Sequence, residues 1–174
     1  GGNKLIFLDV SKNLVLRELK CAANLLTSLD VSKIQTLELL WCFSNQLSIL
    51  DVSNNKNLSN LNCRKNQLKN IDVRSNTKLN SLDCSENSLM ELDIRRNPNL
   101  SHVHCADNNL SASALNQIYE NLPKPPAPYS AQDPLGLFTI AGSYTLDIRN
   151  NPGTVASNRD IAKNKGWEVL EYER

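Results

Sequence analysis

The strongest constraint in this sequence is a cysteine at every twenty-first residue. All five cysteines of the 174-residue chain lie on this spacing: Cys21, Cys42, Cys63, Cys84 and Cys105. Asparagine recurs with the same step three residues after each cysteine, at Asn24, Asn45, Asn66, Asn87 and Asn108. A strict period shared by several residue types is an internal repeat, and it predicts a chain that coils through similar stacked turns.

Each repeat contains two apolar halves. One half reads L-x-x-L-x-C-x-x-N-x-L, which is the leucine-rich repeat pattern with cysteine in its second strand position. The other half has Leu or Ile followed by Asp and then Val or Ile, beginning at Leu8, Leu29, Leu50, Ile71 and Leu92. Residues 5–109 hold five such turns of 21 without insertions, which predicts a regular solenoid.

Alternation within each half predicts extended backbone. The L-x-C segment is expected to form a short parallel strand, with Leu19 and Cys21 inward and Lys20 outward in the first turn. The L-D-V half is expected to form a second strand or an extended segment on the opposite flank, giving a flattened tube without outer helices. The asparagines are expected to satisfy buried backbone groups in the bend after the strand.

The outward aspartates of the L-D-V half have two interpretations. They are Asp9, Asp30, Asp51, Asp72 and Asp93. A stack of carboxylates about 4.8 Å apart raises a calcium hypothesis, because hard cations prefer several oxygen ligands. A structural role is favoured, since the turn residues that follow, such as Ser11 and Ser32, can hold each carboxylate locally.

The cysteines are interpreted as buried free thiols. Side chains at one repeat position point inward in parallel, which is poor geometry for a disulfide, so we favour small apolar core residues over disulfides or metal ligands. The cysteines therefore do not indicate a redox compartment.

Charge and composition restrict the classes of partner. The chain has 19 basic and 18 acidic residues and a formal charge of +1, which argues against a nucleic-acid partner. Neither a transmembrane segment nor a signal peptide is visible. Because residues 1–5 already lie within a repeat, we expect the chain to be a piece of a longer protein.

After Leu110 the period breaks, and residues 111–174 are expected to form a cap on the solenoid of residues 1–110, within the same structural domain. Residues 111–122 predict a helix capped by Ser111 or Ser113 that covers the open end of the solenoid. A proline-rich loop and a strand at 137–142 follow.

The end of the cap is expected to return to the repeat. Residues 145–153 echo residues 91–99, which places Asp147 with the outward aspartates and predicts a degenerate half-turn that continues the sheet. A helix at 157–165 ended by Gly166 and a final strand at 167–172 complete the cap.

Residues 5–110 resemble the 21-residue class of bacterial leucine-rich repeat proteins, and the cap is similar to the ends of such proteins in gut anaerobes. The cap motifs are Leu110 to Leu115, Asn151 to Gly153, and Asn164 to Trp167. The resemblance implies a secreted or surface-anchored binding protein, often with an upstream lipoprotein signal, and no shared catalytic residues. Four positions depart from the pattern: Ile34 for Asn, Val103 for Leu, and Arg74 and Arg95 for Ser. The predicted fold class is α/β, a leucine-rich repeat solenoid of short parallel strands.

Variable outward positions beside the cysteines are the expected binding surface. Leu39, Trp41 and Phe43 form an apolar patch in the second turn. The other candidate binding residues are Asn62, Arg64, Asp83, His102 and His104. Contact with a partner is favoured over covering by upstream residues or ordinary exposure. Trp41 could also stack on a sugar ring.

Chemistry at this surface is not expected. His102, His104 and Asp83 have a spacing that could hold zinc, but solvated histidines are the favoured interpretation. A triad of Ser85, His104 and Asp83 would lack an oxyanion hole on a flat sheet. We therefore predict no metal, no cofactor and no enzyme activity.

The predicted function is a monomeric, non-enzymatic recognition module that binds protein. The alternatives are a glycan-binding surface module and a structural spacer in a larger surface protein. The predicted location is extracellular or at the cell surface, with lipid anchoring through an upstream region.

Overall fold

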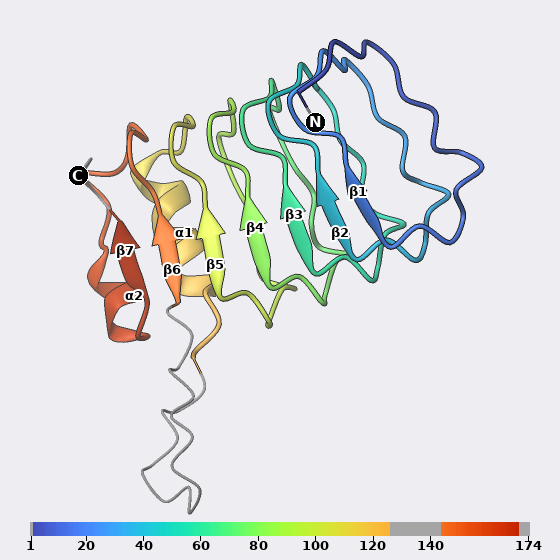
Figure 1. The fold of residues 1–174 in the computed structure, drawn as a ribbon. Helices are drawn as coiled ribbons and strands as arrows, with labels where there is room; N and C mark the ends of the chain where they lie inside the picture. The colour runs from blue at the N-terminus through green and yellow to red at the C-terminus, as the bar shows by residue number, and fades with distance from the viewer. Residues whose placement is uncertain (1, 126–143, 171–174) are drawn as a thin grey trace, which may run out of the picture.

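The computed structural model describes residues 2–125 and 144–170, and these form a solenoid with one parallel sheet (Figure 1). Seven strands lie side by side in chain order. They are β1 Glu18–Lys20, β2 Leu39–Trp41, β3 Asn60–Asn62, β4 Ser81–Asp83, β5 His102–His104, β6 Thr145–Asp147 and β7 Glu168–Leu170. The fold prediction is confirmed, and the sheet continues past the five predicted repeats.

Each of the first five strands pairs with the residues one period away. Leu19 lies opposite Leu40, and Leu40 lies opposite Leu61. The predicted strands include the cysteine, whereas the observed strands β1 to β5 end one residue before it. The cysteine amide still continues the hydrogen-bond ladder, since Cys21 N–H donates to the Trp41 carbonyl at 2.9 Å. The period of the sequence therefore sets the register of the sheet directly.

The opposite flank is extended rather than helical. The L-D-V segments of residues 2–110 are not strands, and turns close them. In the first turn Asn13 N–H donates to the Val10 carbonyl at 3.0 Å, and Leu16 N–H donates to the Asn13 carbonyl at 3.1 Å. Of the two predicted alternatives, the extended segment is correct.

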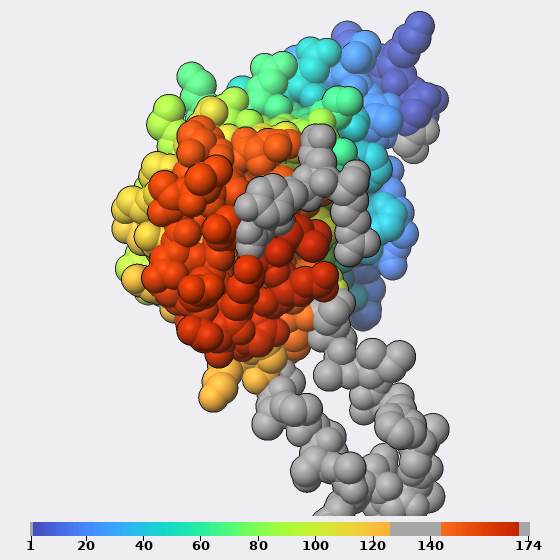
Figure 2. Space-filling model, turned by 90° about the vertical axis from the view of Figure 1, so that its left-hand side faces the viewer, coloured from blue at the N-terminus to red at the C-terminus, as the bar shows by residue number. Residues whose placement is uncertain are grey.

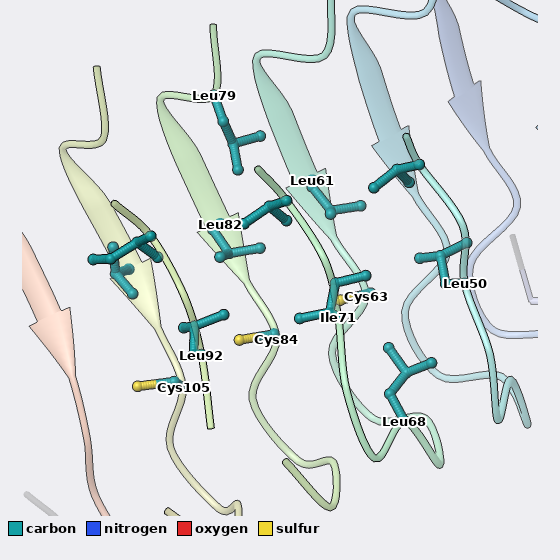
Figure 3. Packing of buried hydrophobic residues seen from close by; sticks show 14 of the residues in the cluster. Leu50, Leu61, Cys63, Leu68, Ile71, Leu79, Leu82, Cys84, Leu92 and Cys105 are labelled. Carbon is teal, nitrogen blue, oxygen red and sulfur yellow. The ribbon is translucent and has the colours of Figure 1, made fainter. Parts of the chain in front are cut away.

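Inward-facing leucines and cysteines form the core between sheet and flank (Figure 3). Leu61, Leu82 and Cys84 are fully buried. All five thiols are free and buried, as predicted. Burial raises the pKa of the Cys63 thiol to about 12, because removal from water disfavours the thiolate. The thiols therefore act as small apolar groups.

The asparagine after each cysteine joins two turns. The amide of Asn45 donates to the carbonyls of Cys42 at 3.0 Å and of Cys21 at 3.2 Å. Its Oδ1 accepts the Leu26 N–H at 3.0 Å. Equivalent bonds to the cysteine carbonyl occur at Asn24, Asn66, Asn87 and Asn108. The predicted role in satisfying buried backbone groups is confirmed.

A second asparagine series lies buried on the flank side. Asn55 donates to the carbonyls of Val31 at 3.0 Å and of Ile34 at 2.8 Å. Asn76 and Asn97 make the same bonds one and two turns further on. Ile34 occupies this position in the second turn, where its carbonyl still accepts the bond from Asn55.

The cap begins with helix α1, Ala112–Asn121. Ser111 caps it, because its Oγ accepts the Ala114 N–H at 3.2 Å. The prediction that this helix covers the open end is wrong. Helix α1 lies on the flank between β5 and β6, and β7 with helix α2, Asp160–Asn164, lies at the end (Figures 1 and 2).

The rest of the cap follows the predicted order with shorter elements. Helix α2 is shorter than predicted, and Gly166 with φ of 89° ends it. The predicted strand at 137–142 and most of the proline-rich loop lie outside the described residues. A Cβ at Gly153 would lie 2.1 Å from the Ala112 nitrogen, so the turn needs glycine to pass the start of α1.

Asp147 is not part of the outward aspartates of the flank. Its strand pairs with β5, and Asp147 lies opposite His104. The echoed motif continues the sheet, as predicted, while α1 takes the flank position in this turn. Asn151 then replaces the ladder asparagine, donating to the Cys105 carbonyl at 2.9 Å and accepting the Leu110 N–H at 3.1 Å.

Replacing Asn45 by Ala should lower the free energy of unfolding by about 2–4 kcal/mol, because the Leu26 N–H and two carbonyls lose their partner. Urea unfolding followed by circular dichroism measures this. Gln46→Ala is the control, since Gln46 is exposed beside it. Equal stability of the two variants would contradict the role assigned to the ladder.

The buried thiols should make stability fall at alkaline pH. Their folded-state pKa values lie above the ordinary value of 9.0, so the unfolded chain loses these protons first. The thiol contribution is complete below pH 9 and is lost as the pH rises toward about 12. Urea unfolding in reductant between pH 8 and pH 11, about the window of thiol ionisation, measures the decline.

Cys63→Ala is the matched variant for this pH dependence. It should be less stable at neutral pH because of the cavity it leaves, yet decline less steeply with pH, because one titrating thiol is missing. An identical slope in the variant and the original chain would show that the thiols do not cause the decline.

Candidate binding surface

The outward face of the sheet arranges the predicted binding residues in columns. Along one column Lys20 lies opposite Trp41, and Trp41 lies opposite Asn62. The same column continues through Asp83 and His104. Neighbouring members are about 4.8 Å apart, as in any sheet. The structure therefore brings together the residues that the sequence places beside each cysteine.

The apolar patch of Leu39, Trp41 and Phe43 exposes less surface than the size of these side chains suggests. Trp41 is exposed by 36%, whereas Leu39 and Phe43 are only partly exposed. The indole N–H of Trp41 donates to Asn60 Oδ1 at 2.9 Å. The Lys20 ammonium lies 5.0 Å from the centre of the Trp41 ring. The ring is therefore held at its edge and over one face.

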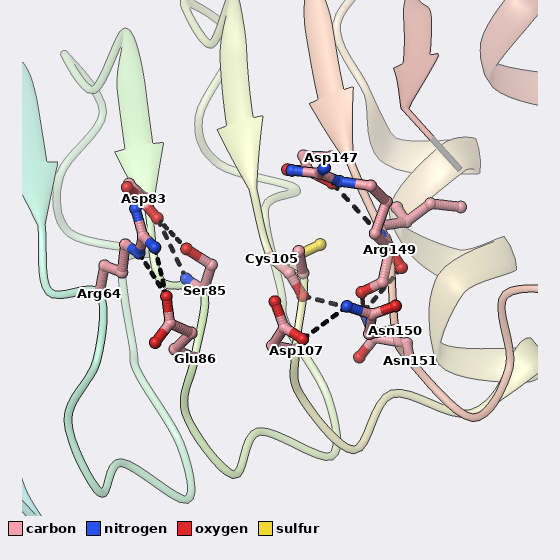
Figure 4. Close-up of polar contacts among 12 residues, drawn as sticks. Arg64, Asp83, Ser85, Glu86, Cys105, Asp107, Asp147, Arg149, Asn150 and Asn151 are labelled. Carbon is pink, nitrogen blue, oxygen red and sulfur yellow. Dashed lines mark hydrogen bonds and ion pairs between the residues drawn. The ribbon is translucent and has the colours of Figure 1, made fainter. Parts of the chain in front are cut away.

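A polar network lies beside the patch on the next two turns (Figure 4). Asn62 donates to Asp83 Oδ2 at 3.2 Å, and the Ser85 hydroxyl donates to Asp83 Oδ1 at 2.5 Å. Arg64 forms a two-bond ion pair with Glu86. The Asn62 and Arg64 contacts link adjacent turns, and the Ser85 contact lies within one turn, so each of these side chains already has a partner within the chain.

The two histidines do not form the chemical sites considered from the sequence. His102 Nδ1 lies 2.7 Å from the Ser101 hydroxyl, and Ser85 has Asp83 as its partner. Within residues 2–125 and 144–170, no group of three His, Cys, Asp or Glu side chains is placed to hold a metal ion. The geometry supports neither a zinc site nor a Ser85, His104 and Asp83 triad.

The cap extends the polar part of the face, because the half-turn of residues 145–153 continues the sheet, as the sequence predicts. Asp147 is buried and accepts two bonds from Arg149, at 2.8 and 2.7 Å. Asn150 donates to Asp107 at 2.8 Å across the turn (Figure 4). The sequence feature that indicates this extension is the similarity of residues 145–153 to residues 91–99.

The flank aspartates have the local role expected for them. Asp9 Oδ1 accepts the Ser11 N–H at 2.8 Å, and Asp30 Oδ1 accepts the Ser32 N–H at 2.9 Å. The N–H and hydroxyl of Ser11 lower the pKa of Asp9, and the hydroxyl and N–H of Ser32 lower the pKa of Asp30, so each carboxylate is held in its turn. The carboxylates thus act as turn residues.

Comparison with known proteins supports the same fold. No protein-family model matches the chain, and no curated protein matches it. Among solved structures it is similar to the functional domain of InlJ from Listeria monocytogenes, which includes a cysteine ladder, with 30% identity over 92% of this chain and a TM-score of 0.54. It is also similar to internalin C2 from Listeria monocytogenes, with 22% identity, coverage of 98% of this chain and 68% of that chain, and a TM-score of 0.71.

The fold is that of the bacterial leucine-rich repeat proteins. This solenoid spans only 40% of the InlJ chain. A third similar structure is the leucine-rich repeat ectodomain of the receptor kinase GASSHO1/SCHENGEN3 from Arabidopsis thaliana, in complex with CASPARIAN STRIP INTEGRITY FACTOR 2. There the identity is 19% over 98% of this chain and 19% of that chain, with a TM-score of 0.64.

In the described part of the solenoid, neither helix has the length and apolar character that a membrane span requires.

Proposed function

We propose that this solenoid is a non-enzymatic recognition module that binds a partner protein on the outward face of its sheet. The observation that carries the proposal is Trp41, exposed by 36% on that face and fixed by Asn60 and Lys20. An aromatic side chain with a settled conformation loses little entropy on binding. Aromatic anchors of this kind dominate protein interfaces.

Charge beside Trp41 indicates the chemistry of the partner. Arg64 pairs with Glu86, while Asp83 accepts bonds from the neutral side chains of Asn62 and Ser85. Asp107 likewise accepts from the neutral amide of Asn150. The polar half of the face is therefore acidic, and a partner with an apolar group next to a basic residue fits it.

A protein partner is favoured over a glycan at this position. Sugar rings stack on a free aromatic face, and the Lys20 ammonium lies over the Trp41 ring at 5.0 Å. A similar leucine-rich repeat ectodomain was solved in complex with CASPARIAN STRIP INTEGRITY FACTOR 2, which is consistent with a macromolecular partner on this fold. A structural spacer would need no such anchor.

A location outside the cell, or on its surface with a lipid anchor, is part of this proposal. The similarity to the leucine-rich repeat ectodomain of a membrane receptor kinase supports it. Protease treatment of intact cells of the source organism, followed by immunoblotting, tests the location. Protection of the chain in intact cells would contradict it.

Trp41→Ala should weaken binding of the partner at least about tenfold, which corresponds to about 1.4 kcal/mol, because the anchor is removed. The partner is first isolated by cross-linking to the original chain and then purified for calorimetry. Ile49→Ala is the matched control, because Ile49 is exposed by 74% but lies outside the strands. Equal loss in both variants, or none in Trp41→Ala, would contradict the site.

A further inference from the structure

Two arginines on the flank, Arg74 and Arg95, have side chains that the turn does not require. In the first three turns Ser11, Ser32 and Ser53 follow the aspartates, and each donates its backbone N–H to the carboxylate at 2.8 to 2.9 Å. In the next two turns Arg74 and Arg95 donate the same backbone bond, at 3.0 and 3.1 Å. The backbone bond completes the turn in all five cases, so the guanidinium groups are not needed for folding.

Both guanidinium groups form the same rigid pair. Arg74 donates from Nε to Asp72 Oδ1 at 3.0 Å and from Nη2 to Asp72 Oδ2 at 2.7 Å. Arg95 repeats these bonds with Asp93 at 3.0 and 2.7 Å. The pairing lowers the pKa of Asp93 to about 2, so both partners stay charged at neutral pH. Two parallel arginine–aspartate pairs therefore lie one turn apart on the surface.

These pairs line a cleft of about 720 Å³. The other polar lining residues include Glu91 of the flank and Gln117 and Asn121 of α1. An α-helix is about 10–12 Å across, roughly twice the spacing between stacked turns. The cleft lies where the extended flank is followed by the thicker helix α1. Arg74 and Arg95 occupy the two flank segments nearest to α1.

The charges in the cleft favour a neutral polar ligand. Asp72, Asp93 and Glu91 give three negative charges against two from Arg74 and Arg95, for a net charge of −1. A net negative cleft disfavours an anion, and both guanidinium groups already have carboxylate partners. The described residues hold no group of acidic or histidine side chains suited to a metal ion. A neutral ligand is not repelled by the negative charge of the cleft and does not need a metal-binding group.

Sugar hydroxyl groups match the remaining hydrogen-bonding capacity. Each guanidinium keeps N–H groups that are not used in its pair, and each carboxylate keeps lone pairs. The side chains of Arg74 and Arg95 are exposed by 56% and 67%, so these groups are accessible. A hydroxyl both donates and accepts, so neighbouring hydroxyls on a ring can bridge a carboxylate and a guanidinium.

We infer that this cleft binds a neutral saccharide, with Arg74, Arg95 and Gln117 contacting its hydroxyl groups. The volume is within the range of small-molecule sites. Ile71 and Leu92 supply the apolar part of the lining, and none of its residues in the described chain is aromatic. Binding therefore depends on hydrogen bonds to fixed groups rather than on ring stacking, and it is separate from the Trp41 surface.

The test is a titration of the ¹⁵N-labelled chain with maltotriose, cellotriose and N,N′,N″-triacetylchitotriose, followed by NMR chemical shifts. Chondroitin sulfate disaccharide is the anionic comparison. The variant Arg74→Ser with Arg95→Ser restores the residue of the first three turns, so the backbone bond and the fold are retained. Arg96→Ser is the matched control, because Arg96 is exposed and does not line the cleft.

At least one neutral trisaccharide should shift the amide signals around Arg74, Arg95 and Gln117. Its affinity should fall at least about tenfold in the double serine variant and stay unchanged in Arg96→Ser and Trp41→Ala. The inference is overturned if no neutral trisaccharide binds, if only the sulfated sugar binds, or if the double serine variant binds as well as the original chain.

Discussion

The asparagine amides that join successive turns are the interaction on which the structure most depends. Each turn is a single thin layer, so the bend after each strand places carbonyl and N–H groups inside the molecule, away from water. An unpaired buried backbone group costs about 1–3 kcal/mol, and the amide of Asn45 satisfies three of them. Because these partners belong to two turns, the same bonds that complete one bend also attach it to its neighbour.

This coupling explains the strict period of the sequence. An insertion in one turn would move an asparagine away from the carbonyl one turn below, so length is conserved within the chain at 21 residues. The cap shows how much freedom remains. There a helix and a long connection separate Cys105 from Asn151, yet Asn151 still donates to the Cys105 carbonyl at 2.9 Å. The contact is restored in space although the spacing in sequence is lost.

The framework also separates two kinds of surface. On the sheet face, fixed register places Trp41 next to an acidic polar network, and ladder bonds hold the strands that carry them. On the flank, the only framework requirement after each aspartate is a backbone N–H, which leaves the side chain of that residue variable. Arg74 and Arg95 use this freedom beside the cleft along α1. Variation is tolerated where the backbone alone maintains the fold.

The amino-acid sequence alone predicts the repeat, the inward cysteines and leucines, the asparagine ladder and the columns beside the cysteines. Each of these follows from local alternation and a fixed period, so no distant contact is needed to infer it. Tertiary structure decided what the period does not reach: the position of α1 on the flank, the assignment of Asp147 to the sheet, and the cleft along the helix. It also decided that Leu39 and Phe43 are only partly exposed. These features depend on packing between elements of different thickness and on neighbours from other turns, which no single repeat encodes.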